Sequence, residues 1–526
     1  MASIEGNDTE EQSQSSGSWI CVNDDEFDAL SINFKPKPVE KYPAKLHARS
    51  VAKRLGTKAG LIYLVGLPSK LYEDSDMPVI FRQRRYFYYL TGIDLPDCTV
   101  TYNIQRDQLR LWIPAERTGR DVIYNGFTPS PDDIYAKYDF DHVGRHGSLD
   151  GYIAHFAHRE SGDIFVLHED QKPKLPERSN GANVWSYIDH FDTSRLQPAM
   201  DASRAIKSAY EIKLIRKASE ISAQAHTNVL LSIKYLENES EVEAVFQATS
   251  IAARAKHQAY GVIAAAGENA STLHYMANNE PLKGRQLLCL DAGCEWKCYA
   301  SDVTRTFPIS GKHTTESKAI YDLVAKMQEE CIKMVKPNAN YRDIHLHAHK
   351  VAIRGLMELG LLNGSFEELY AAGASVMFLP HGLGHYMGLE VHDVGAVGNL
   401  LYAFQDEHKD WMSAYHEIRS QPSTSASSIL APNMVITVEP GIYFSRYALE
   451  DVYLKDPKYA KFINKDFLQY YYPVGGVRIE DDILVTEDGF ENLTTAPKGQ
   501  AALDIINGYD ENATVAMKAK SRGWSW

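Results

Sequence analysis

Short runs of apolar residues, either alternating with polar ones or continuous, are the main pattern of the first 190 positions. Period-two alternation and brief apolar blocks bounded by turn residues are typical of β-strands. Arg106-Asp107 predicts a hairpin turn, and residues 152–158 have helical spacing. The predicted strands cover 60–66, 78–83, 99–104, 108–113 and 163–168. Strands mixed with helices predict an α/β N-terminal domain over residues 40–190.

The second half of the chain begins with helical patterns. Ser208 to Glu211 and Ser240 to Glu243 both have the Ser-x-x-Glu form of a capping box, which marks the start of a helix. Apolar residues at helical spacing predict further helices over 316–335 and 341–359. Strand-like runs lie between and after these helices, at 286–291, 299–308, 434–439 and 476–484. This order predicts an α+β domain over residues 200–500.

The predicted helix 341–359 contains a His-x-His-x-His run, which would resemble metal spacing on a strand. Helical geometry puts His345 and His349 on one face and His347 elsewhere. The pattern therefore favours ordinary histidines on a helix surface over a metal site.

Both ends of the chain differ from its middle. Residues 1–18 are rich in Ser, Gln and Glu and predict a disordered tail, and residues 507–526 read as a second tail of unknown role.

Composition and charge exclude several classes of partner. Lys and Arg number 55 against 69 Asp and Glu, a net charge of −14, which disfavours nucleic acid and anionic membranes. The sequence contains no run of about 18 apolar residues, so it does not predict a membrane span. The six cysteines show no disulfide spacing, and the first residues lack a basic start followed by an apolar run. A cytoplasmic protein is the expectation.

Candidate chemistry gathers in residues 379–393, where three histidines, three glycines and one proline lie close together. This composition suits neither a regular helix nor a strand, but it suits imidazoles held at a site by a tight backbone. His381, His385 and His392 are the residues concerned.

Four carboxylates belong to strand-like runs, Asp291 and Glu439 at their ends and Asp302 and Glu480 within them. Asp291 and Asp302 come from neighbouring runs and suggest either a cation between them or a pair of turn-capping aspartates. Period-two alternation puts Glu439 beside Thr437, and Arg478 beside Glu480. An Arg next to a carboxylate is either a structural ion pair or a group that orients a metal ligand.

Four carboxylates with one imidazole carry too much negative charge for one ion. Two divalent ions match the set better, and its oxygen-rich character favours manganese over a metal that seeks thiolates. The chemistry suggests a two-metal hydrolase, although residue chemistry alone does not choose these five residues among all the acids and histidines of the chain.

Six runs of sequence closely resemble the motifs of the pita-bread metallopeptidases, in the order of that family. The likeness covers residues 40–500 and is strongest to the Xaa-Pro aminopeptidase and prolidase branch. The runs are Ala266-Gly-Glu-Asn-Ala-Ser-Thr-Leu-His274, Leu290-Asp291-Ala-Gly, Ser301-Asp302-Val-Thr-Arg-Thr-Phe-Pro308, Pro380-His-Gly-Leu-Gly-His385, Thr437-Val-Glu439-Pro-Gly-Ile-Tyr and Gly476-Val-Arg-Ile-Glu480-Asp.

The resemblance implies an α/β N-terminal domain followed by an α+β pita-bread (creatinase/aminopeptidase) catalytic domain. It also implies a homodimer that removes the N-terminal residue from peptides with proline in second position, using two divalent ions per chain. The residues that it assigns are the metal ligands Asp291, Asp302, His385, Glu439 and Glu480, of which Asp302 and Glu480 bridge both ions; the catalytic residues Glu439, His381, His392 and His274; and Arg478 and Thr304 behind the ligands.

One region departs from the family's usual pattern, and it leaves the exact activity open. Relatives restricted to dipeptides use an arginine from the region 398–430 on the substrate carboxylate, and Arg419 is the nearest candidate here. Xaa-Pro aminopeptidase is favoured over prolidase. An inactive binding protein, or a metal-free enzyme of the creatinase type, would be expected to lack several of the five ligands, which this chain retains.

Overall fold

The computed structural model describes residues 40–160, 162–173, 191–394, 400–401, 410–420 and 429–508. Both predicted tails, except Asn507 and Gly508, and most of the divergent region 398–430 lie outside these residues. No helix in the described part is long and apolar enough to span a membrane.

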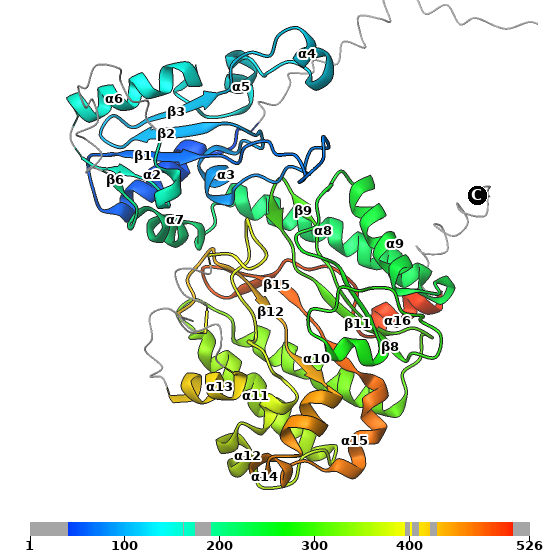
Figure 1. The fold of residues 1–526 in the computed structure, drawn as a ribbon. Coiled ribbons are helices and arrows are strands. Elements are labelled where there is room, and N and C mark those ends of the chain that lie inside the picture. Colours follow the sequence, from blue (N-terminus) through cyan, green and yellow to red (C-terminus); the bar gives the residue numbers. More distant parts are fainter. Residues whose placement is uncertain are drawn as a thin grey trace, which may run out of the picture. The chain divides into compact units, whose positions relative to one another are not determined.

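The N-terminal part is built on a six-stranded mixed sheet in the order β4-β3-β2-β1-β5-β6. The central strands β1 to β3 pair antiparallel, whereas β4, β5 and β6 join in parallel. Figure 1 shows this sheet with its helices in blue and cyan. The strands are β1 (Leu61–Val65), β2 (Thr99–Asn103), β3 (Gln108–Ile113), β4 (His142–Arg145), β5 (Ile164–Phe165) and β6 (Phe191–Asp192). The helices are α2 (Ala44–Leu55), α3 (Arg85–Thr91), α4 (Arg120–Asn125), α5 (Pro131–Lys137), α6 (Leu149–Arg159) and α7 (Leu196–Arg204).

Both faces of this sheet are covered, and successive side chains of β1 point alternately into the core on one face and the core on the other. Ile62 and Leu64 belong to the core shared with α2, α3 and α7, while Leu61 and Tyr63 belong to the cluster under α6. A strand buried on both faces reads as a continuous apolar run, as this one does. The predicted α/β character of this part is therefore present.

One predicted strand of this part is wrong. Residues 78–83 form no strand: Pro78 makes only an isolated bridge to Leu71, and Ile80 is 72% exposed. No described strand lies beside this segment, so its backbone N–H and C=O groups cannot form the hydrogen bonds of a sheet.

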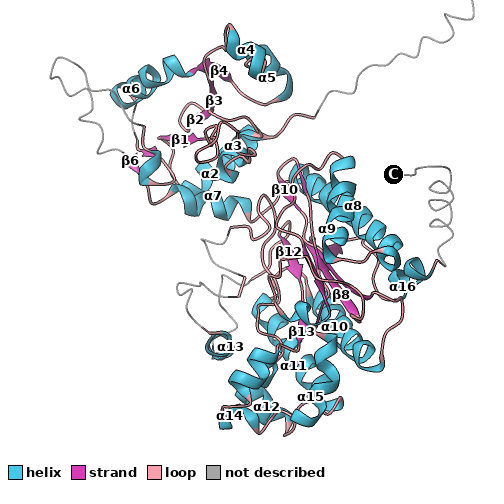
Figure 2. Ribbon diagram, turned by 45° about the vertical axis from the view of Figure 1, so that its right-hand side comes forward, coloured by secondary structure: helices cyan, strands magenta, loops and turns pink. Residues whose placement is uncertain are grey.

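The C-terminal part places short antiparallel sheets between pairs of long helices (Figures 1 and 2). The three-stranded sheets have the orders β11-β8-β7 and β12-β15-β16, and two pairs, β10-β9 and β13-β14, accompany them. The strands are β7 (Ile263–Ala266), β8 (Leu287–Asp291), β9 (Glu295–Trp296), β10 (Tyr299–Ala300), β11 (Thr304–Pro308), β12 (Val435–Val438), β13 (Gly441–Tyr443), β14 (Gly476–Arg478), β15 (Asp481–Val485) and β16 (Phe490–Asn492). The helices are α8 (Ala209–Ser232), α9 (Glu239–Ala252), α10 (Thr315–Met334), α11 (Tyr341–Glu358), α12 (Phe366–Ala372), α13 (Trp411–Ser420), α14 (Pro457–Ala460), α15 (Lys465–Tyr471) and α16 (Gln500–Asn507).

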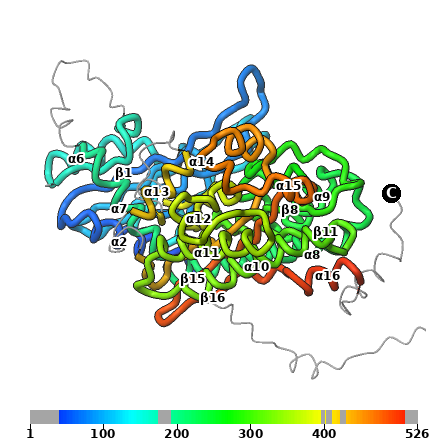
Figure 3. The backbone as a smooth tube through the Cα atoms, turned by 90° about the horizontal axis from the view of Figure 1, so that it is seen from below, coloured from blue at the N-terminus to red at the C-terminus, as the bar shows by residue number. Residues whose placement is uncertain are grey.

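Two separate helix layers enclose these strands. Side chains of α8, α9 and α16 pack on the sheet of β7, β8 and β11. Helices α10 and α11 lie side by side (Figure 3) and pack on β12 to β15. The strand ends, which carry the acids, are therefore held from both sides by apolar contacts.

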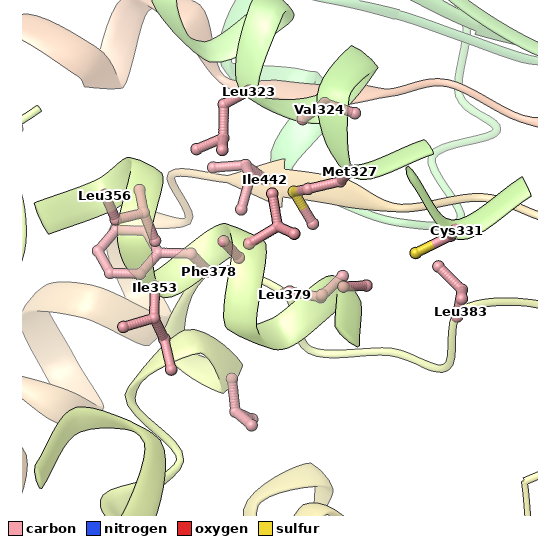
Figure 4. Close-up of a cluster of buried hydrophobic side chains, with 14 of the residues drawn as sticks. Leu323, Val324, Met327, Cys331, Ile353, Leu356, Phe378, Leu379, Leu383 and Ile442 are labelled. Carbon is pink, nitrogen blue, oxygen red and sulfur yellow. The ribbon is translucent and has the colours of Figure 1, made fainter. Parts of the chain in front are cut away.

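The same core fixes the beginning of the histidine-rich segment 379–393, called the histidine loop below. Figure 4 shows Phe378, Leu379 and Leu383 among side chains of α10, α11 and β13, all of them almost fully buried. Leu379 and Leu383 flank His381, so burial of the two leucines fixes the backbone that carries this imidazole.

Several predicted helix starts and strands are confirmed, with local corrections. Ser208 caps α8 through the predicted capping box, but α9 is capped by Asn238 with Glu241 rather than by Ser240. The predicted strand 476–484 is two strands, β14 and β15, separated by two residues that include Glu480.

The prediction of surface histidines on α11 is wrong for two of the three. His345 and His349 share one face as expected, but each is 1% exposed, and His349 contacts His345 at 3.2 Å and Ser375 Oγ at 2.8 Å. Helical spacing predicts which residues share a face, but not whether that face is covered.

Candidate metal centre and active site

The acids and histidines predicted as site residues line one cavity of about 570 Å³. Each acid stands at a strand end: Asp291 closes β8, Asp302 precedes β11, Glu439 follows β12 and Glu480 lies between β14 and β15. Antiparallel pairing of β8 with β11 puts Thr304 opposite Asp291. The predicted ligands and histidines in the lining are Asp291, Asp302, Glu439, Glu480, His274, His381, His385 and His392.

Three of the predicted ligands lie close enough to share one ion. Asp302, His385 and Glu480 each offer a ligand atom, and these atoms all lie within 4.8 Å of one another. His385 Nε2 lies 3.4 Å from Asp302 Oδ2 and 3.4 Å from Glu439 Oε1. Its Nδ1 contacts the Tyr386 carbonyl at 3.0 Å, and donation there leaves Nε2 for the acids or for a metal.

Glu480 shows most directly that a cation fits this site. Thr304 Oγ1 donates to Glu480 Oε2 at 2.7 Å, but Oε1 is buried without a hydrogen-bond partner among the described residues. A buried polar atom left unsatisfied costs about 1–3 kcal/mol. Carboxylate oxygens are the ligands that hard divalent cations prefer, so the donor set matches such ions.

Crowding of the acids changes their proton affinities. Burial raises the pKa of Glu439 to about 7 and, with the neighbouring carboxylates Asp302, Glu439 and Asp291, raises the pKa of Glu480 well above its ordinary value. Such repulsion is what a bound cation relieves.

His385 and Asp302 form an ion pair within this acidic group. Burial alone would lower the pKa of His385, but Asp302 and Glu439 raise it to about 9. For Asp302 the directions are opposite: burial alone would raise its pKa, but the His385 imidazole lowers it below its ordinary value. Without a metal, the imidazole therefore carries a proton in the place where a cation would sit.

Asp291 is held by two donors from different strands and loops. Arg478 Nη2 donates to its Oδ2 at 2.6 Å, and Tyr260 Oη donates to its Oδ1 at 2.6 Å. Arg478 Nε also donates to Thr304 Oγ1 at 3.2 Å, which in turn donates to Glu480. The guanidinium therefore orients two acids of the cavity at once.

A second chain of hydrogen bonds runs from Arg478 to His381. Arg478 Nη1 donates to Tyr443 Oη at 2.9 Å, and Tyr443 Oη lies 3.0 Å from His381 Nε2. Burial and the charge of Arg478 lower the pKa of His381 to about 4, so this imidazole is neutral near pH 7. Its Nδ1 contacts the Gly382 carbonyl at 2.8 Å and donates there, so Nε2 accepts from Tyr443.

Backbone contacts bring the histidine loop against β12. His385 N donates to Thr437 Oγ1 at 3.1 Å, and Thr437 N donates to the His385 carbonyl at 2.9 Å. A Cβ on Gly384 would lie 2.2 Å from the Thr437 carbonyl oxygen, so only glycine permits this approach.

The two remaining histidines lie toward the open side of the cavity. The His392 ring lies 4.3 Å from the His385 ring in an edge-on arrangement. The charge of His385, followed by burial, lowers the pKa of His392 to about 4. His274 is exposed and lines the cavity with Leu273 and Met276.

Two tyrosines that the sequence did not single out belong to this arrangement. Tyr260 gave no signal, since it stands in an irregular segment. Tyr443 ends the Glu439-Pro-Gly-Ile-Tyr run, where a proline interrupts the alternation that could have placed it on the same face as Glu439.

Family models match both parts of the chain. Residues 44–165 match the aminopeptidase P N-terminal domain, and residues 213–487 match metallopeptidase family M24. These matches assign the chain to the metallopeptidases, a class that uses divalent metal ions. The predicted fold class, an α/β domain followed by a pita-bread catalytic domain, is confirmed.

Individual relatives narrow the assignment. A probable Xaa-Pro aminopeptidase of Sclerotinia sclerotiorum is 63% identical over 97% of this chain and 96% of its own. Two solved forms of E. coli aminopeptidase P are each 25% identical. The low-pH form has a TM-score of 0.70 and covers 89% of this chain and 99% of its own; a zinc-substituted form in complex with product has a TM-score of 0.69 and covers 90% and 100%. The chain belongs to the Xaa-Pro aminopeptidase branch of metallopeptidase family M24.

Proposed function

We propose that this protein is a metallo-aminopeptidase that removes the N-terminal residue from peptides with proline in second position. The observation that carries the proposal is the cavity lined by all five residues of the predicted ligand set, four acids and one imidazole. In it, the buried Glu480 Oε1 has no hydrogen-bond partner among the described residues. Relatives and solved neighbours named as Xaa-Pro aminopeptidases or aminopeptidase P support it.

The residues that would hold two divalent ions are Asp291, Asp302, His385, Glu439 and Glu480. When bound, the ions would supply a water whose pKa is low enough to be deprotonated near pH 7. Arg478 and Thr304 keep the acids oriented from behind through the hydrogen bonds given above.

The chain's own groups would carry the proton and the developing charge. Glu439 accepts the proton of the attacking water and delivers it to the proline nitrogen that leaves. His392 lies on the substrate side of the cavity, where a neutral imidazole would donate a hydrogen bond to the oxyanion of the tetrahedral intermediate. His381 also lines the cavity, and it would take part in this stabilisation only if its N–H turned from the Gly382 carbonyl toward the substrate. His274 is exposed and lines the same cavity, where it would contact the substrate.

Specificity for proline has a chemical reason. An Xaa-Pro bond is a tertiary amide without an N–H, so an enzyme that depends on that donor binds it poorly. The apolar lining contributed by Leu401, Trp411 and Val391 suits a pyrrolidine ring.

A prolidase is the alternative, and the structure disfavours its candidate residue. Arg419 Nη1 donates to the Tyr370 carbonyl at 3.2 Å, and its guanidinium lies over the rings of Tyr370 and Tyr415. Among the described residues that line the cavity, Arg478 is the only arginine or lysine, and it is occupied by Asp291 and Tyr443. A free dipeptide carboxylate would have no available cation among them.

Activity on three peptides tests the proposal. A longer Xaa-Pro peptide should be cleaved, Gly-Pro should be cleaved more slowly, and a matched Xaa-Ala peptide should resist. Chelation should abolish cleavage and manganese should restore it. If no peptide is cleaved, the enzyme proposal fails and an inactive binding protein is left. Cleavage that resists the chelator would point to a metal-free enzyme, and faster cleavage of Gly-Pro would point to a prolidase.

Asp302→Ala tests the ligand set separately. This variant should fail to retain two ions after dialysis, as measured by elemental analysis, and a variant that keeps both ions and full activity would refute the assignment.

Four finer points belong to the same proposal. We propose manganese as the native metal, a homodimer, a cytoplasmic location, and domains spanning residues 40–190 and 200–500. The five described cysteines are all buried and unpaired, which agrees with a reducing compartment. Elemental analysis of protein purified without added ions, light scattering, fractionation and limited proteolysis test these points in turn.

A further inference from the structure

The loop that carries His392 closes on itself. Asp393 N donates to the Tyr386 carbonyl at 2.9 Å, and Gly388 N donates to the Glu390 carbonyl at 3.0 Å. Residues 386–393 are called the His392 loop below. Because its two ends meet, the position of His392 depends on how Asp393 is held.

The carboxylate of Asp393 fills the inside of the His392 loop. Its side chain is 1% exposed, and a Cβ on Gly388 would lie 2.5 Å from Oδ2. The glycine therefore leaves the space that the carboxylate occupies. A buried carboxylate needs partners of opposite charge, because an isolated one is costly in a low-dielectric interior.

Those partners come from a segment far away in the sequence. Arg204, at the end of α7, forms an ion pair with Asp393 Oδ1, and Lys207 Nζ lies 3.5 Å from Oδ2. The Arg204 and Lys207 side chains are 3% and 1% exposed. Arg204 also lies over the Tyr86 ring at 4.6 Å. Two fully buried cations on one buried carboxylate make any shift of the loop expensive.

A second ion pair holds the other side of the same loop. Arg82 Nη2 donates to Glu390 Oε2 at 2.8 Å, and Arg85 Nε donates to Oε1 at 3.3 Å. Residues that precede α8 therefore contact the loop on both sides of His392.

We propose that Arg204 and Lys207 are positioning residues, which act through Asp393 to hold His392 in place beside His385. The proposal rests on the catalytic role proposed for His392. Arg204, Lys207 and Asp393 do not belong to the ligand set. His385, which does, is fixed independently by its backbone contacts with Thr437. Loss of Arg204 should therefore disturb the imidazole at the substrate side and spare the metal centre.

A double-mutant cycle between Arg204→Met and His392→Ala tests the proposal. Arg204→Met should lower kcat about 10–100-fold, the effect of misplacing a catalytic group by about 1 Å, with little change in KM and with the metal content of the wild type. Arg204→Lys, which keeps the charge, should recover part of the loss. In the His392→Ala background, Arg204→Met should not lower kcat any further, because the imidazole that Arg204 positions is already absent.

Controls separate this effect from a general loss of structure. Arg216→Met removes the half-exposed ion pair of Arg216 with Glu491 and should leave kcat within about twofold of the wild type. If Arg204→Met does not fold, Lys207→Met replaces it in the cycle, since the pair of Arg204 with Asp393 survives in that variant.

Two results would overturn the proposal while leaving the enzyme assignment intact. One is an active wild type in which the Arg204→Met and His392→Ala losses multiply independently. The other is an Arg204→Met variant that loses its metal together with its activity. An inactive wild type would instead count against the proposed function.

Discussion

Binding of divalent metal to the metal-free protein should release protons, because several ligands hold protons that a cation must displace. Burial raises the pKa of Glu439 to about 7, and that of Glu480 lies well above its ordinary value. Against the effect of burial, Asp302 and Glu439 raise the pKa of His385 to about 9. A metal ligand must be deprotonated, so binding is linked to pH.

The size of the effect follows from these values. At pH 6, Glu439 is about nine-tenths protonated and His385 is almost fully protonated, so the two together release about two protons, and Glu480 adds to them. Near pH 6 the apparent metal affinity should therefore rise at least about 100-fold per pH unit. At pH 8 Glu439 contributes only about 0.1 proton.

The same shifts make the metal-free protein less stable as pH rises. Glu439 is an acid whose folded pKa is above its ordinary value of about 4.5, so its contribution is present below pH 4.5 and lost as pH rises through 7, about 3 kcal/mol. His385 is a base with a raised pKa, so its contribution is present below about pH 6.5 and lost as pH rises through 9. Bound metal should reverse this trend.

Calorimetric titration in two buffers of different ionisation enthalpy measures the released protons directly. We expect two or more at pH 6 and fewer at pH 8, and Glu439→Gln should release about one fewer at pH 6. Thermal unfolding of the metal-free protein should show a Tm that falls from pH 5 to pH 8. Release of less than half a proton at pH 6, or a Tm that rises over this range, would refute the reasoning.

Three further variants probe the surroundings of the site. Thr304→Val removes the donor to Glu480 and should weaken metal binding about 10–100-fold, as measured by competition with a chelator. Tyr443→Phe removes the hydroxyl that donates to His381 and should lower kcat about tenfold with the metal retained, which kinetics and elemental analysis check together. Trp411→Ala removes apolar surface from the cavity and should raise KM for Xaa-Pro peptides about tenfold, with kcat nearly unchanged.

The sequence predicts the positions of two acids of the site, because each of these two ends an apolar run. Asp291 and Glu439 follow buried strands, and the strand pattern alone placed them at strand ends. Periodicity could not bring together residues almost 200 positions apart, because the register between strands is a tertiary property. The resemblance to a family supplied that choice.

Errors in the sequence reading arise where burial depends on distant partners. Residues 78–83 have the pattern of a strand but lack a neighbour, and Ile80 stays exposed. His345 and His349 look like surface residues, yet Ser375 accompanies them in a buried group. In both cases the local pattern does not specify which distant element covers or pairs with the segment.

The His392 loop combines both kinds of information. It lies in the segment 379–393, whose glycines and histidines mark it in the sequence as tight and chemically active, and one end is fixed nearby through β12. Its other fixation, at Asp393, depends on Arg204 and Lys207, for which no local pattern predicts a contact almost 190 residues away. The imidazole proposed to meet the substrate therefore depends on the segment between the N-terminal sheet and α8, which gives that segment a direct part in placing the catalytic group.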